Sequence, residues 1–176
     1  MSLLRPDTVS EISGSAIILD TNTFVEGYSH PSEFAILLDE LTHADCALTT
    51  IEPVRIEFLS KNRSIQELST KAQFYEETLT YPELPTRTFE AQLQEYSLLY
   101  AFGKQSQAFK AVDYMIAAAM KKYTSHVLLL TNDHHDFTTQ LFDLRMLIPL
   151  MPAQGCVISF GLYAFSEDKY AALLER

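Results

Sequence analysis

Short apolar runs alternate with longer mixed segments along the chain, and these runs predict buried strands. Ala16–Asp20 is apolar up to its closing acid, and Val127–Leu130 is wholly apolar. Such runs are typical of strands that are covered on both faces in a parallel sheet. Further strands are expected around Cys46–Thr49 and, late in the chain, at Arg145–Met151 and Cys156–Ala164.

The segments between these runs carry apolar residues three and four positions apart, which indicates amphipathic helices. Pro31 suits the first turn of one helix, and Glu52 with Pro53 opens another. Asp136 could begin a helix late in the chain. Further helices are expected at Ser64–Thr80, Thr88–Phe102, Ser106–Tyr123 and Ser166–Leu174. This order of strands and helices predicts an α/β fold.

The composition indicates one domain, because the 176 residues are 47% apolar and 20% charged. We expect a loosely ordered segment over residues 1–14, a single domain over 15–176, and a helical insert at about 64–103. No apolar run approaches the roughly 20 residues of a membrane span, and the start of the chain lacks a secretory signal. With only two cysteines, the sequence predicts a soluble cytoplasmic protein without a membrane partner.

The formal net charge of −10 disfavours broad coating of a nucleic acid, because affinity for phosphate comes largely from Lys and Arg. It does not exclude a nuclease. Hydrolytic sites that hold divalent cations are themselves acidic, and the cation then meets the phosphate. Local basic groups such as Lys61 with Arg63 could guide RNA or be merely solvated.

Two acids follow buried strands. Asp20 ends the first strand, and Asp133 lies three residues beyond Leu130. In open α/β sheets the ligand crevice lies beyond the carboxyl ends of the strands, so acids that are distant in sequence can converge there. Each of these acids has an alternative role as the cap of a following helix, and the pattern alone does not decide between the two roles.

Two more acids lie on expected helices. Asp113 interrupts the most apolar one, where an ionised carboxylate costs several kcal/mol of desolvation unless a charge or hydrogen bonds compensate it. The alternative places Asp113 on a narrow polar side of that helix. Glu57 alone fits a solvated helix face. Together with Asp20 and Asp133, these residues predict an oxygen-only cage suited to Mg²⁺ or Mn²⁺.

His134 and His135 stand beside these acids. A His there could donate to a phosphate, but adjacent His residues point in different directions. No second His at the i, i+4 spacing completes a zinc motif. We interpret both residues as part of a solvated turn.

Four segments carry motifs in a fixed order. They are Ile17–Asn22 with its Asp and Asn, Glu57 after the second strand, Asp113–Ala119 with its Ile-Ala-Ala, and Leu130–Phe137 with its Thr, Asn and Asp-Phe. Together they resemble the PIN-domain ribonucleases, most closely the VapC-like toxins of toxin–antitoxin pairs. The likeness covers roughly Ala16 to Met151. It implies a three-layer α/β/α domain with a central, mostly parallel sheet.

The resemblance also implies a site and an activity. Asp20, Glu57, Asp113 and Asp133 would form the acidic cluster that holds the metal, with Asp136, Asn22 and Thr131 as supporting residues. Asp133 and Asp136 compete for the fourth ligand position, and we favour Asp133 because it directly follows the strand end. The activity would be Mg²⁺- or Mn²⁺-dependent cleavage of RNA by a homodimer, with an antitoxin whose basic tail covers the site.

Two other functions stay open. A PIN-like binding module could receive a basic peptide in its acidic pocket and cut nothing, which the net charge favours. A metal-dependent phosphatase or DNA nuclease could use the same acids, because a metal-activated water does not by itself choose a substrate.

Overall fold

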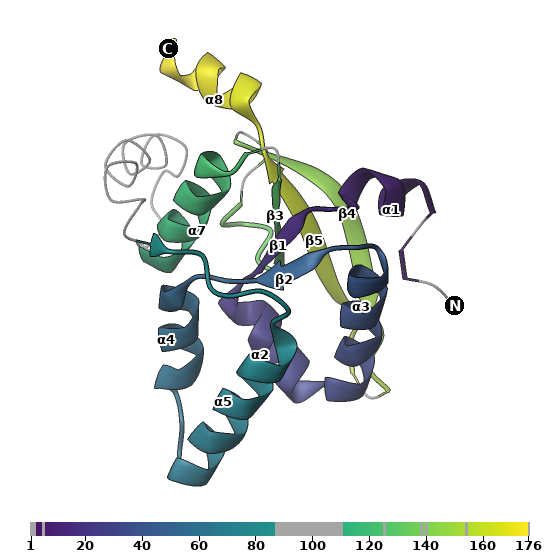
Figure 1. The fold of residues 1–176 in the computed structure, drawn as a ribbon, viewed down its shortest axis with the longest axis vertical. Coiled ribbons are helices and arrows are strands. Elements are labelled where there is room, and N and C mark those ends of the chain that lie inside the picture. Colours follow the sequence, from purple (N-terminus) through teal and green to yellow (C-terminus); the bar gives the residue numbers. More distant parts are fainter. Residues whose placement is uncertain are drawn as a thin grey trace.

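A five-stranded sheet forms the centre of the molecule (Figure 1). The computed structural model describes residues 3–4, 6–86, 111–124, 126–137, 139, 141–153 and 155–175. The strands lie in the order β2-β1-β3-β5-β4, and β1 pairs in parallel with both β2 and β3. β5 runs antiparallel to β3 and β4. The strands are β1 (Ala16–Leu19), β2 (Ala47–Thr49), β3 (Val127–Thr131), β4 (Phe142–Leu150) and β5 (Ile158–Phe165).

Helices flank this sheet, with α3 and α7 on opposite sides of it in Figure 1. The expected α/β fold with a mostly parallel central sheet is therefore confirmed, since β5 alone among the five described strands runs against the others. The arrangement is compatible with three α/β/α layers. The helices are α1 (Pro6–Ile12), α2 (Thr21–Ser29), α3 (Pro31–His43), α4 (Glu52–Ser60), α5 (Ile65–Thr78), α7 (Ala111–Lys122) and α8 (Glu167–Leu174).

Several elements differ from the sequence-based expectations. α1 and α2 were not predicted, because both are short and their polar residues weaken the apolar spacing. β4 begins at Phe142 instead of Arg145, because Phe142 is buried and pairs with Phe165. No helix follows Asp136 among the described residues before β4. The expected helix at Thr88–Phe102, and with it the later part of the insert, lies outside the described residues.

An aromatic cluster fixes α4 and α5 against α2, which positions the helix that carries Glu57. The Phe24 ring lies 5.5 Å from that of Phe58 and 4.9 Å from that of Tyr75, measured between centroids. All three side chains are buried. Aromatic pairs at this spacing contribute about 0.5–1.5 kcal/mol beyond the area they bury. The orientation of α4 relative to α2 is therefore set by aromatic packing.

Candidate functional site

The ends of β1 and β3 form the position in the sheet where a ligand crevice is expected. The chain leaves β1 toward β2 on one side and later returns to β3 on the other side, so β1 and β3 flank a topological switch point. Leu19 is the register partner of Leu130, and the next residues are Asp20 and Thr131. In open α/β sheets, ligands bind beyond the carboxyl ends of the strands at such a point.

Asp20 caps α2 and accepts three hydrogen bonds. Its Oδ1 accepts from the backbone N–H of Thr21 at 2.6 Å, which is the cap interaction expected of its alternative role. Its Oδ2 accepts from Asn22 Nδ2 and from Thr131 Oγ1, each at 2.8 Å. The Asp20 side chain therefore joins the end of β1 to the end of β3, and the structure brings together three of the predicted site residues.

Thr131 is the centre of this polar group. Its Oγ1 lies 3.0 Å from Asn22 Nδ2 and accepts the backbone N–H of Asp133 at 3.0 Å. Asn22 Oδ1 accepts the backbone N–H of Asn132 at 3.2 Å. Asn22 and Thr131 thus orient the segment that follows β3.

Burial sets the electrostatics of Asp20, which is 4% exposed. Desolvation raises the pKa of Asp20 from an ordinary 3.8 to about 6, against the opposing effect of the hydrogen bonds from Thr131 and Thr21. The charges of Glu57 and Asp133 contribute a smaller part of this rise. Glu57 on α4 and Asp133 in the turn after β3 therefore both act electrostatically on the buried Asp20 carboxyl.

Glu57 faces the N-terminal turn of α2. Its Oε2 accepts a hydrogen bond from Thr21 Oγ1 at 2.7 Å. Glu57 is also only partly exposed. The hydrogen bond and the partial burial together contradict the interpretation of Glu57 as a residue on a solvated helix face. Thr21, next to Asp20, is a site residue that was not predicted from the sequence. A hydroxyl after the capping acid was the available signal.

Asp113 is 8% exposed on α7, so its predicted burial is confirmed. α7 contacts both α4 and β3. Asp113 and Glu57 therefore lie on adjoining helices, and the charge of Asp113 contributes to the raised pKa of Tyr114, after desolvation. The alternative of a solvated polar side is excluded for Asp113.

Asp133 and Asp136 have different surroundings. Asp133 is partly exposed, and its Oδ1 accepts the backbone N–H groups of His135 and Asp136 at 3.2 Å each. Asp136 is 3% exposed. The charge of Asp133 contributes, after desolvation, to the raised pKa of Asp20, and the preference for Asp133 over Asp136 as the fourth ligand stays a prediction.

His134 lies in an exposed turn, as the sequence predicted, and its ring also contacts β5. Its Nδ1 lies 2.6 Å from the hydroxyl of Tyr163 and its Nε2 lies 3.0 Å from the carbonyl oxygen of Ser159. The neutral tautomer with hydrogen on Nε2 satisfies both contacts, because it donates to Ser159 and accepts from Tyr163. Through this residue β5 holds the turn that carries Asp133.

The carboxylates of these acids are suitable ligands for a divalent cation, but their side chains are not yet arranged as a complete metal site. Carboxylate oxygens are the ligands that Mg²⁺ and Mn²⁺ prefer, and a cation would offset the burial of Asp20 and the like charges beside it. In the part of the chain that the structure describes, no three His, Cys, Asp or Glu side chains are grouped so as to hold a metal ion. The donors fit the ion, and ligation by three of them requires side-chain rearrangement.

Comparison of the chain with models of known protein families, with curated proteins and with solved structures finds no match. None of the helices that the structure describes combines the length and apolar character that a bilayer crossing requires.

Proposed function

We propose that the chain is a metal-dependent endoribonuclease of the PIN type that hydrolyses RNA phosphodiester bonds at the end of β1 and β3. The supporting observation is the buried carboxyl of Asp20 at the switch point, with its pKa raised to about 6 and two further carboxylates acting on it. Strongly perturbed acids in such a position are typical of functional sites.

In this proposal Asp20, Glu57, Asp113 and Asp133 would hold Mg²⁺ or Mn²⁺. A divalent cation supplies positive charge that lowers the pKa of a water molecule and stabilises negative charge on phosphate oxygens. Thr131 orients the Asp20 carboxylate through its 2.8 Å hydrogen bond. Thr21 does the same for Glu57, leaving Glu57 Oε1 outside that hydrogen bond.

Cleavage of a mixed pool of single-stranded and structured RNA tests the activity. Purified protein is assayed with Mg²⁺, Mn²⁺ or EDTA, beside Asp20→Asn and Asp113→Asn. Asp39→Asn, on the exposed side of α3, is the matched control. The proposal requires metal-dependent cutting that is lost in both site variants and kept in the control. Full activity of Asp113→Asn would contradict the four-acid site.

The role as a toxin of a toxin–antitoxin pair is a finer part of the same proposal. It includes a homodimer in the cytoplasm and a partner with a basic tail, which the acidic site would attract. Growth inhibition on expression without the partner, abolished by Asp20→Asn, is the expected outcome. An inert protein that still cuts RNA would leave the nuclease and exclude the toxin.

A specific observation favours a second candidate, a binding module without catalysis. The Asp20 carboxylate already accepts three hydrogen bonds, as a purely structural cap would. As a binding module, the protein would bind a Lys- or Arg-rich peptide through the acidic side chains of the site. Metal-independent binding of such a peptide, together with no cleavage of RNA by folded protein, would favour this candidate over the nuclease.

A further inference from the structure

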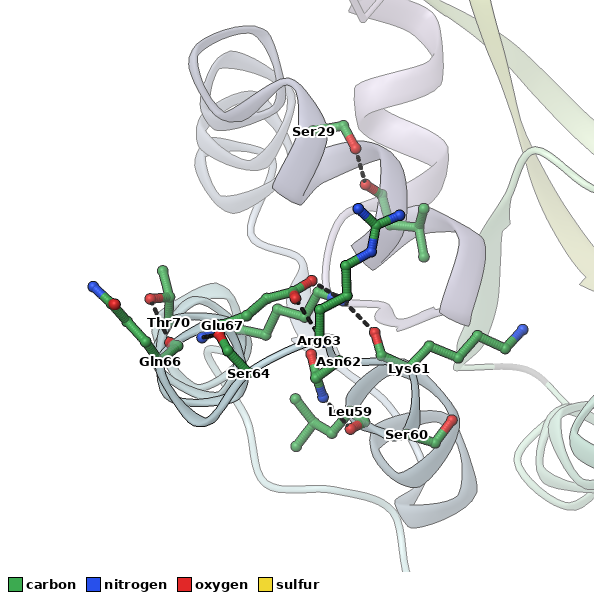
Figure 2. A network of polar contacts seen from close by, with 12 residues as sticks. Ser29, Leu59, Ser60, Lys61, Asn62, Arg63, Ser64, Gln66, Glu67 and Thr70 are labelled. Atoms are coloured by element: carbon green, nitrogen blue, oxygen red, sulfur yellow. Dashed lines mark hydrogen bonds and ion pairs between the residues drawn. The ribbon is translucent and has the colours of Figure 1, made fainter.

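The loop between α4 and α5 carries two cations, Lys61 and Arg63, directly after the helix that bears Glu57. Lys61 is the C-cap residue that directly follows α4, four positions after Glu57 in the chain. Arg63 lies two residues further on. Figure 2 shows the Lys61 side chain extending away from α5, and the two cationic side chains extending in different directions from the loop.

These cations differ from others in the described part of the chain, where Arg55, Lys71, Arg145 and Lys169 each form an ion pair. Lys61 and Arg63 are exposed, and no ion pair joins either of them to another described residue. The hydrogen bond from the Arg63 backbone and, to a lesser extent, the Arg63 charge lower the pKa of the Glu67 carboxyl, but both cationic side chains remain exposed to an anionic ligand in a chain of net charge −10.

The backbone of this loop is held in place from α5 (Figure 2). Lys71 Nζ donates to the carbonyl oxygen of Lys61 at 3.0 Å. Glu67 Oε2 accepts the backbone N–H of Arg63 at 2.8 Å, and Ser64 Oγ accepts the backbone N–H of Glu67 at 3.1 Å. Glu67 also pairs with Lys71 at 3.3 Å. The loop is therefore pre-organised, and substitution of the Lys61 or Arg63 side chain leaves these contacts in place.

We propose that Lys61 and Arg63 form a cationic subsite that binds backbone phosphates of single-stranded RNA on one side of the bond to be cleaved. This inference rests on the proposed function and names the surface that the RNA strand follows away from the acids. The net negative charge of the chain does not prevent this binding. Exposed charges act over a Debye length of about 8 Å at physiological salt, so the more distant acidic surface is largely screened from the RNA.

Binding of a fluorescein-labelled, mixed-sequence single-stranded RNA by the full chain tests the subsite. Fluorescence anisotropy is measured in EDTA, which prevents metal-dependent cutting, over a range of salt concentrations. Lys61→Gln with Arg63→Gln should weaken binding on the order of tenfold across sequences and lower the slope of log affinity against log salt by about 0.7 for each phosphate that is no longer bound. Arg145→Gln with Lys169→Gln is the control with the same change in net charge.

The outcomes separate this inference from the proposed function. Equal weakening in the control pair, unchanged binding in the Lys61 and Arg63 pair, or no RNA binding by the wild-type chain would overturn the subsite. Binding of anionic phosphatidylserine vesicles instead of RNA would also overturn it. RNA that is bound through the subsite but never cut with Mg²⁺ or Mn²⁺ would support the subsite and refute the nuclease.

Discussion

Replacement of Asp20 by Asn should stabilise the protein at neutral pH while it abolishes function. Burial raises the pKa of Asp20 from 3.8 to about 6, so keeping the group ionised at pH 7.5 costs the folded state about 3 kcal/mol. Asn keeps an oxygen for the N–H of Thr21 and remains a good helix cap. Its NH2 group would then face the NH2 group of Asn22, and loss of the hydrogen bond from Asn22 costs about 1–2 kcal/mol. The expected net gain is about 1–2 kcal/mol.

The pH dependence gives this prediction its signature. Between pH 3.8 and about 6 the folded state binds more protons at Asp20 than the unfolded state does. The free energy of unfolding of the wild type therefore falls as the pH rises through this window, and the full cost is present above about pH 6. The advantage of Asp20→Asn should consequently appear as the pH rises through the window and be absent near pH 4.

Urea unfolding in EDTA at several pH values between 4 and 8 measures the difference, with Asp39→Asn as a control expected to show no such dependence. A gain of 1 kcal/mol corresponds to about 2–4 °C in Tm for a domain of this size. If Asp20→Asn is instead less stable at pH 7.5, by an amount that does not change with pH, the electrostatic reasoning is refuted. Asp20 would then be a structural cap.

Three further substitutions test the geometry around the site. Thr131→Val should lower the free energy of unfolding by about 2–3 kcal/mol, because it removes a buried hydroxyl with three polar partners; urea unfolding measures it, and Thr131→Ser should retain most of the stability. His134→Ala should lower the free energy of unfolding by about 1 kcal/mol and speed hydrogen exchange in the turn after β3, since it removes the hydrogen bond with Tyr163. Unchanged exchange in this turn would show that His134 does not hold it against β5. Gly27→Ala should cost about 1–3 kcal/mol in thermal unfolding, because the added Cβ would overlap the buried ring of Phe34.

The strands and the position of the acids could be predicted from local pattern. Ala16–Leu19 and Val127–Leu130 are apolar runs that end at polar residues, and strands of this kind are read reliably when they are buried on both faces. The switch-point rule then placed Asp20 correctly beside the residues after β3. Here sequence and structure agree because one physical requirement, burial of both faces, determines both.

Contacts between distant segments could not be predicted in this way. The bonds from His134 to Tyr163 and Ser159 depend on β5 lying between β3 and β4, and no local pattern gives that strand order. The link from Thr21 to Glu57 likewise depends on how aromatic packing turns α4. These long-range contacts convert isolated polar residues into a connected group.

The electrostatic environment of Asp20 favours the binding of a cation over a purely structural role. A helix cap needs only an oxygen, and Asn or Ser supplies one without the cost of a buried charge. The hydrogen bonds to Asp20 lower its pKa, yet desolvation outweighs them, and Glu57 adds like charge at the same place. A cation reverses the sign of both unfavourable effects, because positive charge beside a buried carboxylate favours its ionised form. A divalent ion and a basic peptide would satisfy this requirement alike, and the RNA cleavage assay decides between the two proposals.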